Sequence, residues 1–145
     1  MASLTILDLD GNELDEIDKE TFKNLPRLIY LRLSKNRIRK IRSSAFSKLN
    51  ALDGLDLQQN ELIDISTTAF EQTAALKYLN LSHNDFSTMD KMGLASLQSL
   101  EVLDVGFNRI RDLDDKGLKR LKWLVELRVR AKIISKNLII HYITL

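Results

Sequence analysis

The chain is 145 residues long, 44% of its residues are hydrophobic, and its formal net charge is +2. This length and apolar content suit one domain with a continuous core, but there is no run of roughly 18 apolar residues that could cross a membrane as a helix. The absence of cysteine excludes a disulfide framework, which small secreted domains usually have.

Leucine recurs at a constant interval of 24 residues, and a period of about 20 to 50 residues indicates a repeat architecture. The neighbouring residues recur as well, in the pattern L-x-x-L-x-L-x-x-N-x-Φ-x-x-Φ, where Φ is apolar. The repeats begin at Leu4, Leu28, Leu52, Leu76, Leu100 and Leu124. We therefore predict a single domain over 1–145, with five full repeats over 4–123 and a divergent partial sixth over 124–145.

Each repeat opens with an alternation of apolar and other residues, which predicts a half-buried β-strand. In the third repeat, Leu55 and Leu57 are expected to face the core, whereas Gly54, Asp56 and Gln58 face outward. Because a strand this short cannot stand alone, the strands should join one parallel sheet. The rest of each repeat then supplies the crossover that parallel strands need.

An asparagine follows each predicted strand, at the ninth position of the repeat. Its carboxamide can donate to and accept from the backbone groups that lose their sheet partners where the chain turns inward. This asparagine ladder consists of Asn12, Asn36, Asn60, Asn84 and Asn108. Losing one such buried bond costs about 1–3 kcal/mol, so we interpret the ladder as structural and not as an active site.

The later part of each repeat carries a large apolar residue directly after a small one. In the first three repeats the large residue is phenylalanine, namely Phe22, Phe46 and Phe70. Aromatic residues at this constant interval are expected to stack into a core spine. We do not interpret them as a ligand-binding box.

These repeats resemble the leucine-rich repeat family from Leu4 to Leu127. The repeat length, the recurring asparagine and the late phenylalanine are similar to the typical subclass found in extracellular receptors and adhesion proteins, and LKYLNLSHNDF and LEVLDVGFNRI are most similar to repeats of Toll-like receptors and chaoptin. The resemblance implies an α/β-type repeat solenoid, a right-handed coil with a concave parallel β-sheet and short loops or 3-10 turns on the convex side. It also implies protein binding.

Two features depart from the family pattern. Extracellular members normally have cysteine-rich caps, and this chain has no cysteine, so both ends should expose apolar surface and favour self-association. In the sixth repeat, Lys132 occupies the asparagine position. We interpret the chain as a fragment of a longer ectodomain, and the tail after Val129 as a degenerate closing coil or as sequence read beyond the repeats.

The outward positions of the predicted concave sheet are the candidate binding site, because their side chains are not needed to hold the fold. Tyr30 and Tyr78 stand two repeats apart, with Gly54 leaving a gap between them. Tyrosine and arginine are enriched in protein-contact hot spots, although tyrosine is also common in strands that bind nothing. The candidate partner-binding residues are Tyr30, Arg32, Asp56, Tyr78, Asn80, Asp104 and Arg128.

The triplet Asn80-Leu81-Ser82 matches the N-glycosylation sequon. Such triplets often arise by chance, and Asn80 also fits the ordinary sequence pattern of the repeat. If the chain is secreted, a glycan at Asn80 would block the concave sheet and move partner binding to its flanks.

Charge alternates along the chain in blocks. Residues 1–20 carry seven acids and one base, 27–48 eight bases and no acid, 52–71 five acids and no base, and 116–136 eight bases and one acid. Neighbouring repeats of opposite charge should attract each other, while the basic end is an alternative site for an acidic partner or glycan. The basic blocks lack regular aromatic interleaving, so no nucleic-acid partner is expected.

No catalytic or metal-binding constellation is evident in the sequence. His83 lies beside Ser82 and Asp85, but these are neighbours in one turn, and a solvent-exposed histidine is the simpler interpretation. No cluster has the spacing of metal ligands or of a calcium loop. We expect no cofactor, no metal and no enzymatic activity.

Two functions remain open. The first is an extracellular or cell-surface recognition or adhesion module of the receptor type, which binds a protein (a second copy or another surface protein) without inserting into the membrane. The second is a cytoplasmic scaffold that docks a signalling or cytoskeletal protein. The lack of cysteine and of a signal peptide favours the second, whereas the repeat length and the phenylalanine position favour the first.

Overall fold

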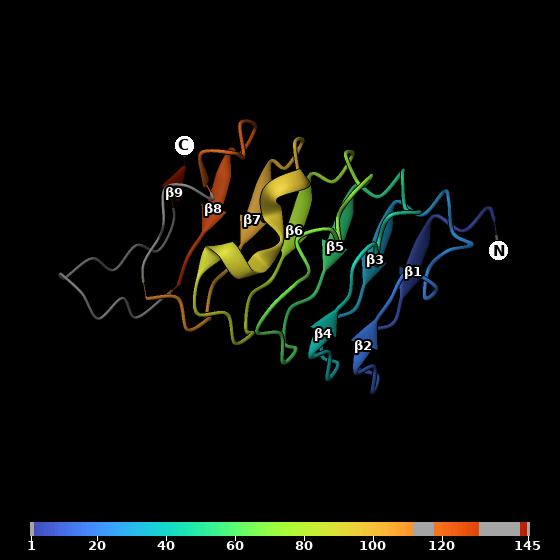
Figure 1. The fold of residues 1–145 in the computed structure, drawn as a ribbon, viewed down its shortest axis with the longest axis horizontal. Coiled ribbons are helices and arrows are strands. Elements are labelled where there is room, and N and C mark those ends of the chain that lie inside the picture. The colour runs from blue at the N-terminus through green and yellow to red at the C-terminus, as the bar shows by residue number, and fades with distance from the viewer. Residues whose placement is uncertain (1, 112–117, 131–142, 145) are drawn as a thin grey trace.

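The computed structural model describes residues 2–111, 118–130 and 143–144. Figure 1 shows a coil of successive repeats whose main-sheet strands lie side by side along one face. The main sheet consists of β1 (Ile6–Asp8), β3 (Tyr30–Arg32), β5 (Gly54–Asp56), β6 (Tyr78–Asn80), β7 (Val102–Asp104), β8 (Glu126–Arg128) and β9 (Ile143–Thr144). All of its pairings from β1 to β8 are parallel. The predicted repeat solenoid with a parallel sheet is confirmed.

The repeat period sets the register of this sheet. Partner residues in each parallel pair are 24 positions apart, so Leu31, Leu55 and Leu79 lie in one line across β3, β5 and β6. Their side chains face the core and are at most 1% exposed. Every position of the repeat therefore forms a row across the sheet. Alternate positions form rows on its outward face, which we call the concave face.

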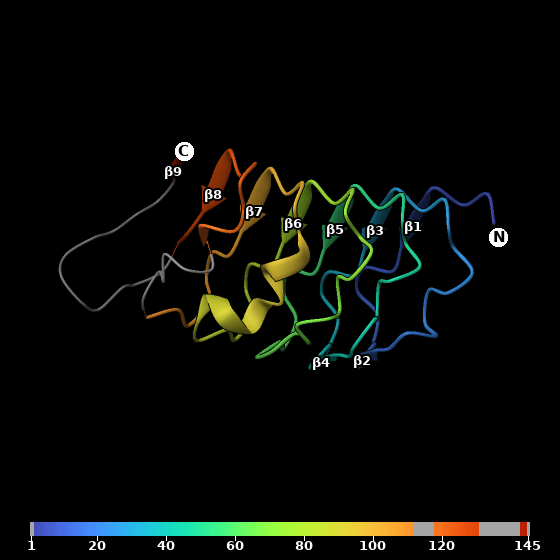
Figure 2. The ribbon, with the colours of Figure 1, turned by 45° about the horizontal axis from the view of Figure 1, so that its top comes forward.

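The opposite, convex side of the coil holds short elements. β2 (Glu16–Ile17) and β4 (Lys40–Ile41) form a two-stranded parallel sheet, which a bridge from Ile41 to Ile65 extends into the third repeat. In the fourth repeat the 3-10 helices η1 (Met89–Met92) and η2 (Leu94–Ser96) follow, and Figure 2 shows them apart from the main-sheet strands. The predicted 3-10 turns are confirmed in the fourth repeat, whereas the strands β2 and β4 were not predicted. In the described part of the chain, no helix is long and apolar enough to cross a membrane.

The asparagine ladder ties each repeat to the one before it. The Asn60 Nδ2 atom donates to the carbonyl oxygens of Leu57 and Gln58 in its own repeat and of Leu33 in the preceding repeat, at 3.0, 3.3 and 3.0 Å. Its Oδ1 atom accepts the N–H of Ile38 at 3.0 Å. The same four bonds recur at Asn36, Asn84 and Asn108. Each of these carboxamides thus satisfies backbone groups of two repeats at once.

The three phenylalanines form a stacked column along the coil. The ring centroids of Phe22 and Phe46 are 6.2 Å apart, and those of Phe46 and Phe70 are 5.3 Å apart, with the planes inclined by 12° and 13°. Phe46 and Phe70 are fully buried. Leu94, at the equivalent position of the fourth repeat, is also buried, so the predicted spine lies within the core.

The two ends of the described coil differ. At the N-terminal end Leu4, Leu7 and Leu9 are only partly buried, and a hollow of about 450 Å³ opens there. At the other end β9 pairs antiparallel with β8. A strand from the tail therefore covers the sheet edge at β8, while the apolar surface expected at both ends stays a prediction. Lys132 lies outside the described residues, and self-association through the ends stays a prediction.

Candidate functional site

The candidate partner-binding residues lie in two neighbouring rows on the concave face. In the third-position row, Tyr30 pairs across the sheet with Gly54, which pairs in turn with Tyr78. The fifth-position row runs from Asp8 in β1 to β8 and contains the candidates Arg32, Asp56, Asn80, Asp104 and Arg128. The sheet thus collects seven residues from five repeats on one face.

The ring of Tyr30 lies directly over Gly54. A Cβ atom added at Gly54 would lie 2.6 Å from the Tyr30 Cδ1 atom and 2.9 Å from its Cε1 atom, so only glycine leaves room for the ring in this position. The expected gap between Tyr30 and Tyr78 is therefore wrong, because the Tyr30 ring fills it. Tyr30 keeps 46% of its surface exposed, so glycine provides a seat for an aromatic ring that still faces solvent.

Each arginine of the fifth-position row is held by a carboxylate. The Arg32 Nη1 atom is 3.2 Å from Asp8 Oδ2, and Arg128 Nε donates to Glu126 Oε1 at 2.7 Å. The N–H of Asp10, followed by the Arg32 guanidinium, lowers the pKa of Asp8, and the Arg128 hydrogen bond lowers the pKa of Glu126. Exposed ion pairs contribute little to stability, so these guanidinium groups can exchange their carboxylates for those of a partner.

Asp56 lies partly buried in the middle of the concave face. Burial raises the pKa of its carboxyl, and the carboxylates of Asp10 and Asp104 raise it further, while the Gln58 N–H, which donates to Oδ1 at 3.0 Å, opposes the rise. Burial also raises the pKa of Tyr78, and the charge of Asp56 adds to that rise. The concave face therefore holds a carboxylate in surroundings that disfavour its charge.

Replacing Asp56 by asparagine should raise the free energy of unfolding at neutral pH, because the amide keeps the bond to Gln58 without a charge. A carboxyl whose pKa is higher in the folded chain binds more protons there. The unfavourable contribution of Asp56 to wild-type stability should thus diminish as the pH falls toward the ordinary value of 3.8, and the variant's advantage over wild type should shrink. Thermal unfolding of both proteins across this range measures the effect. An advantage that stays constant with pH would contradict an origin in charge.

The acids and the amide of the fifth-position row also end their strands, a role that the sequence analysis missed. In each case the side-chain Oδ1 atom accepts the backbone N–H two residues later, an Asx turn. The bonded pairs are Asp8 with Asp10, Asp56 with Gln58, Asn80 with Ser82 and Asp104 with Gly106, at 2.9 to 3.1 Å. The recurrence of Asp or Asn at this position was the signal. Arg32 and Arg128 stand outside this pattern.

Asn80 is the most buried residue of the fifth-position row, with 6% of its surface exposed. Its Oδ1 atom also accepts the Ser82 hydroxyl at 2.7 Å, and its Nδ2 atom donates to Gln58 Oε1 at 3.4 Å. The expectation that outward positions are free of folding duty is therefore wrong here, because Asn80 holds the turn after β6. The nitrogen that would carry a glycan has little exposed surface.

A second group of side chains, absent from the predicted site, lies beyond the carboxyl ends of β6, β7 and β8. The rings of His83 and Phe107 stack with centroids 4.2 Å apart and planes inclined by 16°. The Arg130 guanidinium carbon lies 5.7 Å from the Phe107 centroid. His83 is exposed, in agreement with the sequence interpretation. Phenylalanine at a repeat position that is polar or glycine in the four earlier repeats was the available signal.

The surroundings of His83 do not form a catalytic triad. The Ser82 hydroxyl donates to Asn80 at 2.7 Å, and the Asp85 carboxylate pairs with Arg109 at 2.9 Å. Neither side chain is engaged with the imidazole in a nucleophile–base–acid chain. Within the described residues, no group of three or more His, Cys, Asp or Glu side chains could hold a metal ion.

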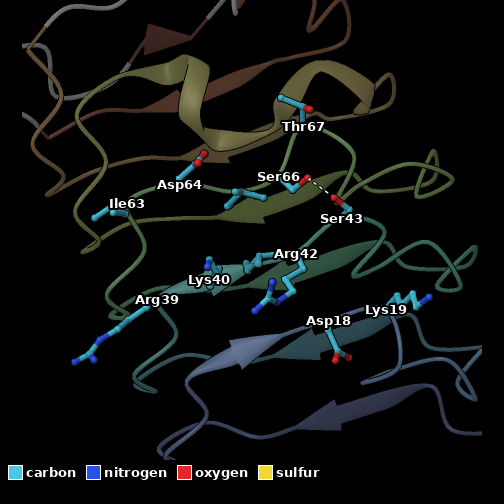
Figure 3. A pocket seen from close by; sticks show the side chains of 12 residues that line it. Asp18, Lys19, Arg39, Lys40, Arg42, Ser43, Ile63, Asp64, Ser66 and Thr67 are labelled. Carbon is cyan, nitrogen blue, oxygen red and sulfur yellow. Dashed lines mark hydrogen bonds between the residues drawn. The ribbon is translucent and has the colours of Figure 1, made fainter.

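The convex side has a hollow of its own, of about 810 Å³, which residues of the first three repeats line. Figure 3 shows its lining, in which basic side chains lie on one side and Ile63 on the other. Arg42 is paired with Glu16 of the first repeat, and Arg39 with Glu61 of the third at 2.7 Å. The alternating charge blocks thus meet as ion pairs between neighbouring repeats on this side.

Comparison with known proteins gives matches of two kinds, to a family model and to solved structures. The family model described as leucine rich repeat matches residues 2–62 and again 55–110. Among solved structures, one titled "Crystal structure of TLR13-ssRNA13 complex" matches with a TM-score of 0.83 and 33% sequence identity over 89% of this chain. The chain spans only 19% of that protein's length. Comparison with curated protein sequences gives no match.

Proposed function

The chain belongs to the leucine-rich repeat family, and from this premise we propose that it is a non-catalytic protein-recognition module of the receptor type. Its partner contacts the concave face of the main sheet. Repeat solenoids use such extended surfaces for binding, because neighbouring repeats leave a continuous row of outward side chains free. The partner is another surface protein or a second copy of this chain.

The observation that carries the proposal is the seating of Tyr30 over Gly54, beside the strand that bears Tyr78. Glycine weakens a strand because it has no side chain to pack. At Gly54 this missing side chain leaves room for the half-exposed Tyr30 ring above the sheet. Tyrosine and arginine dominate binding hot spots. Arg32 and Arg128 carry no strand-ending role, so these two arginines join the two tyrosines as the principal contact residues.

A protein partner fits this face better than a nucleic acid does. The structure that this chain resembles is titled as a complex with single-stranded RNA. On this chain, however, the concave face carries the carboxylates of Asp8, Asp10, Asp56 and Asp104. Phosphate backbones are bound chiefly by basic groups, and four carboxylates along the face would repel a polyanion.

We place the module at the cell surface or in an extracellular space, in a receptor or adhesion protein. The support is the similarity to a Toll-like receptor over most of this chain. The alternative is a cytoplasmic scaffold for a signalling or cytoskeletal protein, which the lack of cysteine favours.

The double variant Tyr30→Ala/Tyr78→Ala should bind its partner at least about tenfold more weakly, since truncating a hot-spot tyrosine costs about 2 kcal/mol. The chain is screened on arrays of purified ectodomains and of cytosolic domains, and the dissociation constant of each hit is measured for wild type and variant. Gly54→Ala provides a second test. It keeps Tyr30 but displaces its ring, so it should weaken the same hit.

The matched control is Arg39→Ala/Ile63→Ala, which removes two exposed side chains from the convex hollow and should leave the affinity unchanged. A partner that binds the concave variants as tightly as wild type and loses affinity for the convex variant would overturn the proposal. A hit confined to the cytosolic array would favour the scaffold alternative.

A further inference from the structure

A ridge of stacked side chains borders the concave face beyond the carboxyl ends of β6, β7 and β8. It consists of His83, Phe107 and Arg130, contributed by three successive repeats, and we call it the stacked ridge. Phe107 is its centre: the His83 ring lies 4.2 Å from the Phe107 ring and the Arg130 guanidinium carbon 5.7 Å from it, both measured to the centroid. Half of the Phe107 surface is exposed to solvent.

The backbone makes phenylalanine an unfavourable choice at this position. Phe107 has a φ of 55°, because its N–H must reach the Arg130 carbonyl of the next repeat at 2.8 Å. The eighth residue of every earlier repeat makes the same bond at positive φ, from Gly11 to His83. Glycine adopts this conformation without strain, whereas bulky side chains rarely do. Neither backbone preference nor burial accounts for an aromatic ring here, and strained exposed residues cluster at binding sites.

The stacked ridge lines a cavity of about 500 Å³ together with Gln58, Ser82, Asp104, Glu126 and Arg128. The cavity contains charges of both signs, two guanidinium groups and two carboxylates. Asp104 accepts the Gly106 N–H at 2.9 Å, and Glu126 accepts from Arg128 at 2.7 Å. An aromatic ring, guanidinium groups and hydrogen-bonding carboxylates thus line one cavity, and a polypeptide can present apolar, acidic and hydrogen-bonding groups to them together.

The C-terminal part of the described coil, which contributes Arg128 and Arg130 to the cavity, is basic in sequence. Residues 118–130 carry five bases and one acid, whereas residues 1–20 at the opposite end carry seven acids and one base. An acidic segment is therefore steered toward the ridge end of the coil. The planar guanidinium of arginine matches a carboxylate in two-point geometry.

We propose that the stacked ridge and its cavity form a peptide-docking site for an extended protein segment in which an apolar residue is followed by an acidic one. The apolar side chain lies against the exposed part of Phe107, and the carboxylate meets the guanidinium groups of Arg128 and Arg130. This inference rests on the proposed function, because it names the partner chemistry at one end of the recognition surface.

The test is a titration of the ¹⁵N-labelled chain, followed by nuclear magnetic resonance, with the capped tetrapeptides Gly-Leu-Glu-Gly and Gly-Leu-Lys-Gly and with the oligonucleotide decauridylate. The Glu peptide should shift the amide signals of Ser82, Gly106 and Phe107 with a dissociation constant in roughly the millimolar range. The Lys peptide should bind about tenfold more weakly, since it reverses the charge that the arginines recognise.

The variant Phe107→Gly should bind the Glu peptide about tenfold more weakly while keeping its fold, because glycine suits the positive φ. The matched control is Gln59→Gly, at the same backbone position two repeats away, which should bind as wild type does. Unchanged binding by Phe107→Gly, equal binding of both peptides, or no shift by about 10 mM peptide would overturn the proposal.

Decauridylate distinguishes the second class of ligand. If it shifts the same signals in preference to the Glu peptide, the site takes nucleic acid and the peptide proposal fails. The proposed function is tested separately, since the Tyr30→Ala/Tyr78→Ala variant leaves the stacked ridge intact. A chain that loses ectodomain binding through the tyrosines but does not bind the peptide would retain the proposed function without this site.

Discussion

Replacing Phe46 by alanine is expected to lower the free energy of unfolding by about 3–5 kcal/mol, the usual range for a buried phenylalanine. Phe46 is fully buried and has a ring neighbour on each side, Phe22 at 6.2 Å and Phe70 at 5.3 Å. Removing it opens a cavity in the middle of the spine, between two repeats that cannot close around it without shifting their strands. Urea unfolding followed by circular dichroism measures the loss.

Two other phenylalanines serve as controls for Phe46. Phe107→Ala removes the same atoms from a half-exposed ring, so its cost should be about 1 kcal/mol, close to the value of one aromatic stack. Phe22→Ala should fall between them, because the Phe22 ring stacks on a single ring of the column. Equal losses at Phe46 and Phe107 would mean that the spine does not hold the repeats together.

The fold was predictable because its determinants recur with the period. A leucine at the same position of successive repeats must face the same side, so the register Leu31–Leu55–Leu79 follows directly from the spacing. The role of the Asn60 carboxamide could be predicted from the sequence, since a turn leaves backbone groups unpaired and a carboxamide can bond them. Its bonds to Leu33 and Ile38 of the preceding repeat depend on how closely the coils approach, which the spacing alone does not specify.

The candidate site was predictable in position but not in detail, because outward residues do not recur. Which way the Tyr30 ring turns depends on the missing side chain of Gly54, a contact between different repeats. The low exposed fraction of Asn80 depends on the turn in which its side chain accepts the Ser82 N–H. The stacking of His83 on Phe107 requires both to share a positive φ, a backbone property that periodicity of hydrophobic residues does not report.

The strands that were not predicted, on the convex side and at the C-terminal end, do not follow from the repeat pattern. β2 and β4 are two-residue strands, too short to show an alternating pattern in the sequence. β9 pairs antiparallel with β8, although every other pairing in the main sheet is parallel. A repeat pattern predicts that each new strand pairs parallel to the strand before it, and β9 departs from that pattern.

Replacing Asn60 by leucine is expected to lower the free energy of unfolding by about 3 kcal/mol. The Leu33 and Leu57 carbonyls each keep a second donor, from Asn36 and Asn84 respectively. The Ile38 N–H loses its acceptor inside a fully buried turn. An orphaned buried donor costs about 1–3 kcal/mol, and each weakened bond adds about 0.5–1.5 kcal/mol. Urea unfolding measures the sum.

Asn60→Asp separates hydrogen bonding from shape, because aspartate has nearly the same volume. Its carboxylate can still accept the Ile38 N–H, but the second oxygen would face the Leu33 and Leu57 carbonyls, to which Nδ2 now donates. The variant should therefore be destabilised at neutral pH and partly recover in acid, since protonation restores one donor. Asn12→Leu, at an exposed position with bonds only to Leu9 and Asp10, should cost about 1 kcal/mol or less. An Asn60→Asp variant as stable as wild type at neutral pH would mean that the ladder acts by filling space and not by satisfying the backbone of two repeats.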